Sequence, residues 1–254
     1  MNTKQDYIAV FDSGVGGISV LRHLLRHLPG ERFYYFGDSA NAPYGTKTKE
    51  EVKALTFAAA EKLLQVGIKA LVVACNTATS AAINELRAKY PELIVIGIEP
   101  ALKVAADRFP GGGIGVMATP MTLREEKFAA LMHRYEEICT IHKLPAPGLV
   151  ELVEAGKADS DQTDALLQNL LASHRDKLDA IVLGCTHYPF AAKAISRVLG
   201  ENVALLDGGD GTARETKRRL AKAGLLEEGS GELVIENSLG CEDRVRLCRQ
   251  LLEM

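Results

Sequence analysis

Two segments of this 254-residue chain resemble each other, and this likeness limits the fold more than any other feature of the sequence. Residues 70–75 read ALVVAC and residues 180–185 read AIVLGC, so Cys185 follows Cys75 by 110 residues. Each segment is an apolar, strand-forming run that ends in a small residue and a cysteine, followed by a threonine-containing turn and a helical pattern. An earlier strand ends in a hydroxyl-bearing turn in both halves, at Ser13 and at Thr119. The sequence therefore predicts two similar α/β units.

Short apolar runs alternate with segments of helical period along the whole chain. The predicted strands are residues 7–11, 32–36, 70–74, 93–98, 113–117, 138–141, 180–183, 203–206 and 233–236. The predicted helices are residues 18–28, 49–66, 77–90, 122–135, 164–174, 190–199, 212–223 and 243–252. Apolar strands between helices indicate mostly parallel sheets flanked by helices on both faces. Residues 111–113, which follow Pro110, have the composition of a linker.

Composition excludes several classes of protein. The net charge is −3 with basic residues scattered along the chain, which argues against a nucleic-acid or anionic-membrane partner. No apolar run approaches the roughly 20 residues that span a bilayer, and the first residues lack the layout of a signal peptide, so we expect a cytoplasmic protein. The five cysteines are odd in number and widely spaced, which argues against a disulfide framework and against a metal site.

The matched cysteines are the strongest candidates for chemistry. A cysteine after a strand is most often a small core residue, but Cys75 and Cys185 occupy equivalent places and precede polar helix starts that favour thiolate. Ligands in open α/β sheets bind at the carboxyl ends of the strands. Two such edges that face each other would form a central cleft with one thiol on each wall. Cys139, Cys241 and Cys248 lack this context and are interpreted as packing residues.

Polar turns near these cysteines allow two interpretations each. Residues 12–17 (DSGVGG) and 37–45 (GDSANAPYG) could hold an anion through backbone N–H groups, or could simply be tight turns. The first lacks the spacing of a dinucleotide-binding or P-loop motif. His187 could move protons or bind a carboxylate, or could be a satisfied core histidine.

Two thiols on opposite walls suit the inversion of a stereocentre, because one group can remove a proton from one face while the other returns a proton to the opposite face. A free thiol has a pKa of about 8.5, which lets both forms serve near neutrality. Charge that develops on a substrate carboxylate must be held by fixed donors in a dry site.

Five motifs in order identify a family resemblance that runs nearly end to end. They are FDSGVGG (11–17), GDSANAPYG (37–45), ACNTATS (74–80), LVE (152–154) and GCTHYPF (184–190). Together they resemble the glutamate racemases, a branch of the cofactor-independent aspartate and glutamate racemase superfamily. The family often has Cys-Pro ahead of LVE and a proline three residues before its glutamate, where this sequence has Ala146-Pro147 and Glu151.

The resemblance implies interconversion of L- and D-glutamate, which supplies D-glutamate for peptidoglycan, with no pyridoxal phosphate, metal or nucleotide. It implies a cytoplasmic homodimer whose partner is its small-molecule substrate, glutamate, with no nucleic acid and no membrane. It also implies two similar α/β domains that face each other across a central cleft, with the C-terminal segment returning to the first domain. We therefore expect residues 1–98 plus 208–254 to form one domain and residues 99–207 the other.

The resemblance also implies roles for individual residues. Cys75 would be the base that acts on D-glutamate and Cys185 the base that acts on L-glutamate, assisted by Asp12 and His187 respectively. Asp38 and Glu154 match further acidic positions, and Glu154 would be coupled to His187. The implied substrate-binding residues are Asp12, Ser13, Pro43, Tyr44, Gly45, Cys75, Asn76, Thr77, Thr119, Cys185, Thr186 and His187.

Three other functions are compatible with parts of the sequence. An aspartate, hydantoin or other amino-acid racemase would keep the mechanism and change the side-chain pocket. A two-lobed sensor of small ligands would not need matched cysteines. A cysteine hydrolase could use Cys185 with His187, but Cys75 would then have no role.

Overall fold

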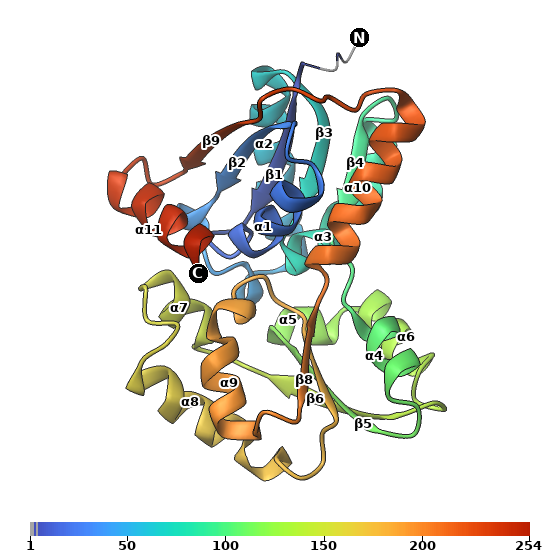
Figure 1. Ribbon diagram of the computed structural model, residues 1–254, viewed down its shortest axis with the longest axis vertical. Helices are drawn as coiled ribbons and strands as arrows, with labels where there is room; N and C mark the ends of the chain where they lie inside the picture. The colour runs from blue at the N-terminus through green and yellow to red at the C-terminus, as the bar shows by residue number, and fades with distance from the viewer. Residues whose placement is uncertain (1–2, 4) are drawn as a thin grey trace. The chain divides into compact units, whose positions relative to one another are not determined.

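The computed structural model describes residue 3 and residues 5–254, apart from the side chain of Lys127, and the chain divides into two compact units. Unit 1 comprises the residues up to Glu99 together with Gly209–Met254, and unit 2 comprises Pro100–Gly208 (Figure 1). The domain boundaries expected from the sequence, 98/99 and 207/208, each lie one residue before these.

A parallel sheet of order β4-β3-β1-β2-β9 forms the centre of unit 1. Its strands are β1 (Tyr7–Asp12), β2 (Arg32–Gly37), β3 (Ile68–Val73), β4 (Ile94–Gly97) and β9 (Glu232–Asn237). Its helices are α1 (Ile18–His27), α2 (Lys49–Val66), α3 (Asn76–Lys89), α10 (Gly209–Ala223) and α11 (Glu242–Glu253), with the short 3-10 turns η1 (Ser39–Asn41) and η2 (Tyr44–Thr46). Helices α10 and α11 pack on α1, and α2 packs on α3, so helices flank the sheet (Figure 1).

Unit 2 has a parallel sheet of order β6-β5-β7-β8. Its strands are β5 (Gly113–Ala118), β6 (Thr140–Pro145), β7 (Ala180–Leu183) and β8 (Ala204–Asp207). Its helices are α4 (Leu102–Arg108), α5 (Pro120–Arg124), α6 (Glu126–His133), α7 (Leu149–Glu154), α8 (Asp161–Leu171) and α9 (Ala192–Leu199), with the 3-10 turns η3 (Ala172–His174) and η4 (Tyr188–Ala191). The predicted fold class, parallel α/β sheets flanked by helices, is confirmed.

The two sheets share one topology. Read from β8, the order 8-7-5-6 in unit 2 corresponds to 4-3-1-2 in unit 1, and β9 is an additional edge strand in unit 1 only. The strands that end at the two cysteines, β3 and β7, each pair with the first strand of their own unit, β1 and β5. The sequence likeness between residues 70–75 and 180–185 therefore reflects equivalent positions in two copies of one supersecondary arrangement.

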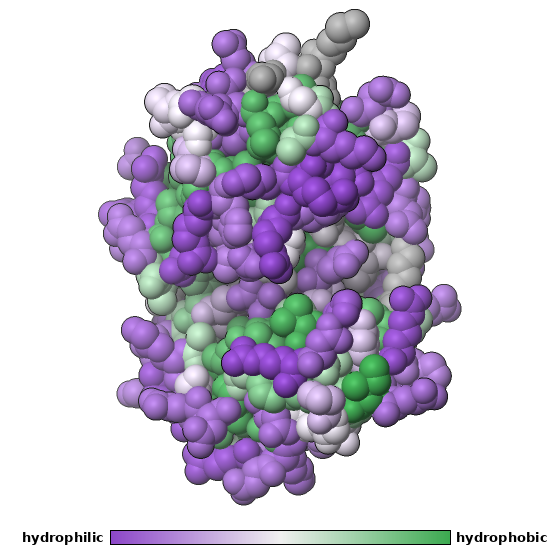
Figure 2. All heavy atoms as spheres, turned by 45° about the vertical axis from the view of Figure 1, so that its right-hand side comes forward, coloured by the Kyte–Doolittle hydropathy of each residue, from purple (hydrophilic) through white to green (hydrophobic). Residues whose placement is uncertain are grey.

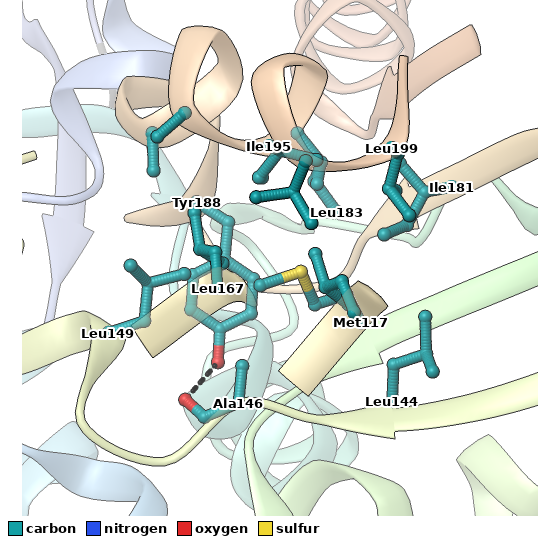
Figure 3. Close-up of a cluster of buried hydrophobic side chains, with 14 of the residues drawn as sticks. Met117, Leu144, Ala146, Leu149, Leu167, Ile181, Leu183, Tyr188, Ile195 and Leu199 are labelled. Atoms are coloured by element: carbon teal, nitrogen blue, oxygen red, sulfur yellow. Dashed lines mark hydrogen bonds between the residues drawn. The ribbon is translucent and has the colours of Figure 1, made fainter. Parts of the chain in front are cut away.

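Apolar side chains fill both faces of the sheet in unit 2. One cluster joins β5 and β7 to α8 and α9, and Figure 3 shows Met117, Leu183 and Tyr188 within it. A second cluster joins the same strands to α4 and α6 through residues such as Leu102 and Phe128. Because both faces are covered, the strands are continuously apolar, which made them recognisable in the sequence.

Helix α10 shows how surface helices are built in this chain. It buries Ala213, Thr216 and Leu220 and turns its charged residues outward, and hydrophilic side chains gather over it in Figure 2. An amphipathic helix of this kind is stabilised by packing one stripe against its neighbours. Within the part of the chain that the structure describes, no helix is long and apolar enough to cross a membrane.

Several predicted elements differ from the structure. The predicted helix 122–135 is two helices, α5 and α6, because Glu125 between them has an extended backbone and Pro120 starts the first helix earlier than predicted. The linker-like residues 111–113 lie inside unit 2, where Gly111 (φ 77°) makes the turn before β5. Helices α4 and α7 have seven and six residues, too few to show a helical period, and were not predicted.

Candidate active site

The two cysteines lie where each sheet reverses its strand order. In unit 1, β2 lies on one side of β1 and β3 on the other, and in unit 2, β6 and β7 flank β5 in the same way. Side chains at the carboxyl ends of the two strands at such a point converge, and open α/β sheets bind their ligands there. The converging residues are Ser13 and Cys75 in unit 1, and Thr119 and Cys185 in unit 2.

The thiol of Cys75 is nearly buried, with 5% of the residue exposed. It donates a hydrogen bond to the Ser13 hydroxyl, with 3.4 Å between Sγ and Oγ. Cys75 is also the N-cap of α3, and its sulfur accepts the Ala78 N–H at 3.4 Å. A sulfur at a helix N-terminus with a hydrogen-bond donor beside it is a setting that stabilises thiolate.

The first residues of α3 supply polar groups next to this sulfur. Asn76 and Thr77 are buried at the start of the helix. The Asn76 amide nitrogen is buried with no hydrogen-bond partner within the described residues. A buried donor without a partner costs free energy, and a ligand oxygen would satisfy it.

The turn after β1 is held by its own carboxylate. Asp12 is fully buried, and its Oδ2 accepts the Gly14 N–H at 3.0 Å. A Cβ on Gly17 would lie 2.5 Å from the Asp12 Cβ, so only glycine fits there. At Gly17, the absence of a side chain therefore lets the backbone approach Asp12 of the protein itself.

The second predicted turn, 37–45, contains a buried acid–phenol pair. The Tyr44 hydroxyl donates to Asp38 Oδ2 at 2.7 Å. The pKa of Tyr44 is raised far above its usual value, mainly by burial and the Asp38 carboxylate, with smaller effects from the charges of Cys75 and Asp12. The phenol is therefore a hydrogen-bond donor at neutral pH, within electrostatic reach of that thiol. Pro43, after a cis peptide bond, and Gly45 flank it.

In unit 2, Thr119 and Cys185 follow the neighbouring strands β5 and β7. Thr119 is the N-cap of α5, and its hydroxyl accepts the Thr122 N–H at 3.2 Å. Cys185 is 8% exposed, and Thr186 beside it is buried. A Cβ on Gly184 would lie 3.1 Å from Ala118, so a small residue is favoured where the turn passes the neighbouring strand.

His187 joins Cys185 to a carboxylate. Its Nδ1 lies 3.7 Å from the Cys185 sulfur, and its Nε2 lies 2.8 Å from Glu154 Oε1. If Nε2 carries the proton that Glu154 accepts, Nδ1 is left as a base toward the thiol. Proton transfer would then give a thiolate beside an imidazolium that Glu154 stabilises.

Tyr188 anchors the loop that carries His187. Its hydroxyl donates to the Ala146 carbonyl at 3.2 Å, as the dashed line in Figure 3 shows. The pKa of Tyr188 is raised by burial and, to a lesser extent, by the charges of Cys185 and Glu151. The segment that contains α7 is therefore bonded at both ends to two consecutive residues. Ala146, three residues before α7 begins, bonds to Tyr188, and Glu154, the last residue of α7, bonds to His187.

The structure gathers the residues named from the sequence into one group in each unit. Unit 1 holds Asp12, Ser13, Asp38, Pro43, Tyr44, Gly45, Cys75, Asn76 and Thr77, and unit 2 holds Thr119, Glu154, Cys185, Thr186 and His187. Sequence reasoning missed Tyr35 and Tyr188, which hydrogen-bond to loops of these groups. Tyr35 gave no signal beyond a phenol within a predicted strand, whereas Tyr188 lies in the GCTHYPF motif but was not singled out within it. Among the described residues, no group of three or more His, Cys, Asp or Glu side chains could hold a metal ion.

Comparison with known proteins defines the class of enzyme. The family model of Asp/Glu/hydantoin racemases matches residues 10–216. The chain belongs to this family, whose members are isomerases.

Within the family, the chain groups with the glutamate racemases. It is 51% identical over 257 residues to the glutamate racemase of Clostridium acetobutylicum, with 100% of each chain covered. The crystal structure of a glutamate racemase isoform from Bacillus anthracis matches with a TM-score of 0.88 and 31% identity, covering 99% of this chain and 95% of that one. The glutamate racemase of Francisella tularensis in complex with D-glutamate matches with a TM-score of 0.85 and 26% identity, covering 99% and 95%.

Proposed function

We propose that this chain interconverts L- and D-glutamate by a two-base mechanism, with Cys75 as the base that acts on D-glutamate and Cys185 as the base that acts on L-glutamate. The observation that carries the proposal is the equivalent placement of the two thiols, each at the carboxyl end of a strand at the point where its sheet reverses order. A hydrolase or a sensor has no use for this duplication. The mechanism requires both sulfurs to reach one Cα, within about 3–3.5 Å of the reacting atoms.

Each thiol has its own means of becoming a base. At Cys75, the Ala78 N–H and the N-terminus of α3 stabilise negative charge on sulfur. The Ser13 hydroxyl, which accepts a hydrogen bond from the thiol, can turn to donate one to the thiolate. We assign to Asp12 the role of assisting the Cys75 thiol. At Cys185, the neutral imidazole of His187 accepts the thiol proton while Glu154 holds the ring.

Removal of an α-proton places charge on the substrate carboxylate, and buried donors must hold it. The unpartnered Asn76 amide is suited to this role in unit 1. We also assign substrate binding to the buried polar residues around the thiols, which are Ser13, Tyr44, Thr77, Thr119, Thr186 and His187, and to Pro43 and Gly45 on either side of Tyr44. No pyridoxal phosphate, metal or nucleotide takes part in the proposed reaction.

The relatives support glutamate rather than aspartate as the substrate. The Clostridium acetobutylicum relative is a glutamate racemase at 51% identity, and the Francisella tularensis structure holds D-glutamate. We propose further that the product D-glutamate serves peptidoglycan synthesis and that the enzyme acts in the cytoplasm as a homodimer.

Solvent deuterium incorporation tests the proposal. With L-glutamate in D₂O and no added cofactor, we expect the α-proton signal to disappear as optical rotation falls to zero, and the product to carry deuterium at Cα. Aspartate in a parallel reaction measures substrate choice. Absence of exchange with every amino acid offered would contradict racemase activity, and faster exchange with aspartate would reassign the substrate.

The Glu154 carboxylate is expected to matter through His187. Glu154→Gln keeps the shape of the side chain but removes the charge that stabilises an imidazolium, so kcat should fall at least about tenfold. Glu151→Gln, one turn earlier on α7 and exposed, is the matched control and should retain activity. Steady-state polarimetry of both variants measures the difference, and equal activities would remove Glu154 from the mechanism.

A further inference from the structure

A buried tyrosine ties strand β2 to the turn that carries Asp12 and Ser13. The Tyr35 hydroxyl donates a hydrogen bond of 2.6 Å to the carbonyl oxygen of Gly14, and Tyr35 is fully buried. A buried phenol needs a partner for its hydroxyl, and here the partner is the backbone of the turn at the end of β1.

A second residue of strand β2, Gly37, also lies against the Gly14 carbonyl. Gly37 lies two residues after Tyr35, and residues two apart in a strand face the same side of the sheet. A Cβ at Gly37 would lie 2.4 Å from Gly14 O. The bare backbone of Gly37 therefore leaves room for this carbonyl, and the Tyr35 hydroxyl holds it there.

The other polar group of Gly14 is also bonded, because its N–H donates to Asp12 Oδ2 at 3.0 Å. Ser13 lies between Asp12 and Gly14 in the chain, and its hydroxyl accepts the bond from the Cys75 thiol. A displacement of Gly14 would therefore move the Ser13 hydroxyl relative to the sulfur and loosen the Asp12 carboxylate.

The Tyr35 ring supports the same turn through packing. A Cβ at Gly17 would lie 3.1 Å from Tyr35 Cε2, which shows that the phenol ring lies beside the start of α1. Phenylalanine would keep this packing and remove only the hydroxyl. The hydrogen bond can thus be tested separately from the ring.

We propose that Tyr35 is a positioning residue for Cys75, which acts through the Gly14 carbonyl to hold Ser13 and Asp12 at the thiol. The inference rests on the proposed two-cysteine mechanism and adds a residue that does not touch the substrate. It predicts that loss of one hydroxyl, remote from the reacting carbon, slows proton transfer at one cysteine and spares the other.

Primary isotope effects on Tyr35→Phe test this asymmetry. Enantiomers have equal free energies, so kcat/KM must fall by the same factor in both directions, and we expect about 10- to 100-fold. The isotope effect should rise with α-deuterated D-glutamate, the enantiomer assigned to Cys75. It should fall toward one with α-deuterated L-glutamate, because the step at Cys185 becomes less rate-limiting.

Tyr34→Phe is the matched control. Tyr34 is the neighbouring residue on β2 and faces the other side of the sheet, where its hydroxyl donates to Glu236 at 2.5 Å. Both substitutions remove one hydrogen bond, so both should lower Tm by about 2–4 °C. Only Tyr35→Phe should change the isotope effects.

Unchanged isotope effects in folded Tyr35→Phe would overturn the inference and leave Tyr35 as a core residue. If Tyr35→Phe does not fold, Gly37→Ala decides, because its Cβ pushes the same carbonyl from the other direction and should produce the same asymmetry. Cys75→Ala distinguishes a failure of the two-base mechanism from a failure of the role proposed for Tyr35. Turnover that survives Cys75→Ala contradicts the mechanism itself, whereas an inactive Cys75→Ala with a normal Tyr35→Phe contradicts only the role of Tyr35.

Discussion

Cys75→Ala and Cys185→Ala are each expected to lower kcat for glutamate racemisation by at least about 10³-fold in both directions, because a general acid or base contributes about 10²–10⁴-fold and each cysteine serves as base in one direction and acid in the other. Neither substitution removes a large side chain, so both variants should remain folded. Polarimetry and circular dichroism measure the two properties. If either single variant retains full activity, the two-base mechanism is wrong.

Cys139→Ala is the control for thiol loss. Cys139 lies in unit 2 and is buried like Cys185, but its sulfur donates to a backbone carbonyl, that of Tyr135 at 3.3 Å, and not to a histidine. Burial raises the pKa of the Cys139 thiol, which keeps it protonated. We expect a small loss of stability from Cys139→Ala and unchanged turnover.

The largest stability effect is expected at a buried ion pair in unit 1. Lys69 Nζ and Glu31 Oε2 lie 2.5 Å apart, and both side chains are 0% exposed. Lys69 also donates to the Leu225 carbonyl at 3.0 Å, and Glu31 accepts the Glu227 N–H at 2.9 Å. The pair thus holds the connection between α10 and β9 against the beginning of β3.

Lys69→Met should destabilise the protein by about 3–5 kcal/mol, because Glu31 is left as a buried charge without its partner. Urea unfolding measures the change. Lys69→Met combined with Glu31→Gln should recover much of this loss, since no lone charge remains and the amide oxygen can still accept the Glu227 N–H.

The exposed pair of Lys103 and Asp107, at 71% and 60% side-chain exposure, provides the comparison. Lys103→Met should cost no more than about 1 kcal/mol, and an equal cost at Lys69 would contradict the role assigned to burial.

Buried parallel strands were the most predictable part of the fold, because helices on both faces force a continuous apolar sequence. The predicted strand 180–183 coincides with β7, whereas strand 138–141 lies at Thr140–Pro145. The latter is an edge strand with several exposed side chains, so its sequence carries a weaker apolar signal.

The site was predictable as a set of motifs but not as a set of contacts. Residue types and the internal repeat pointed to Cys75 and Cys185, and family resemblance supplied most of their neighbours. Local sequence could not show that Tyr35 reaches Gly14 or that His187 reaches Glu154, since the partners are 21 and 33 residues apart. The Tyr35 bond depends on β1 and β2 being neighbours in the sheet. The His187 bond depends on α7 ending at Glu154.

The order of the two units along the chain has a consequence for biosynthesis. Chains emerge from the ribosome from the N-terminus and fold in units as these become available. All four strands of unit 2 lie before residue 208, whereas β9, α10 and α11 of unit 1 follow it. The unit that begins second is therefore the first whose parts are all translated. Until translation passes residue 237, the first sheet lacks β9 and has β2 at an edge. Helix α1 is not covered by α10 until residue 223 has been translated, nor by α11 until residue 253 has been translated.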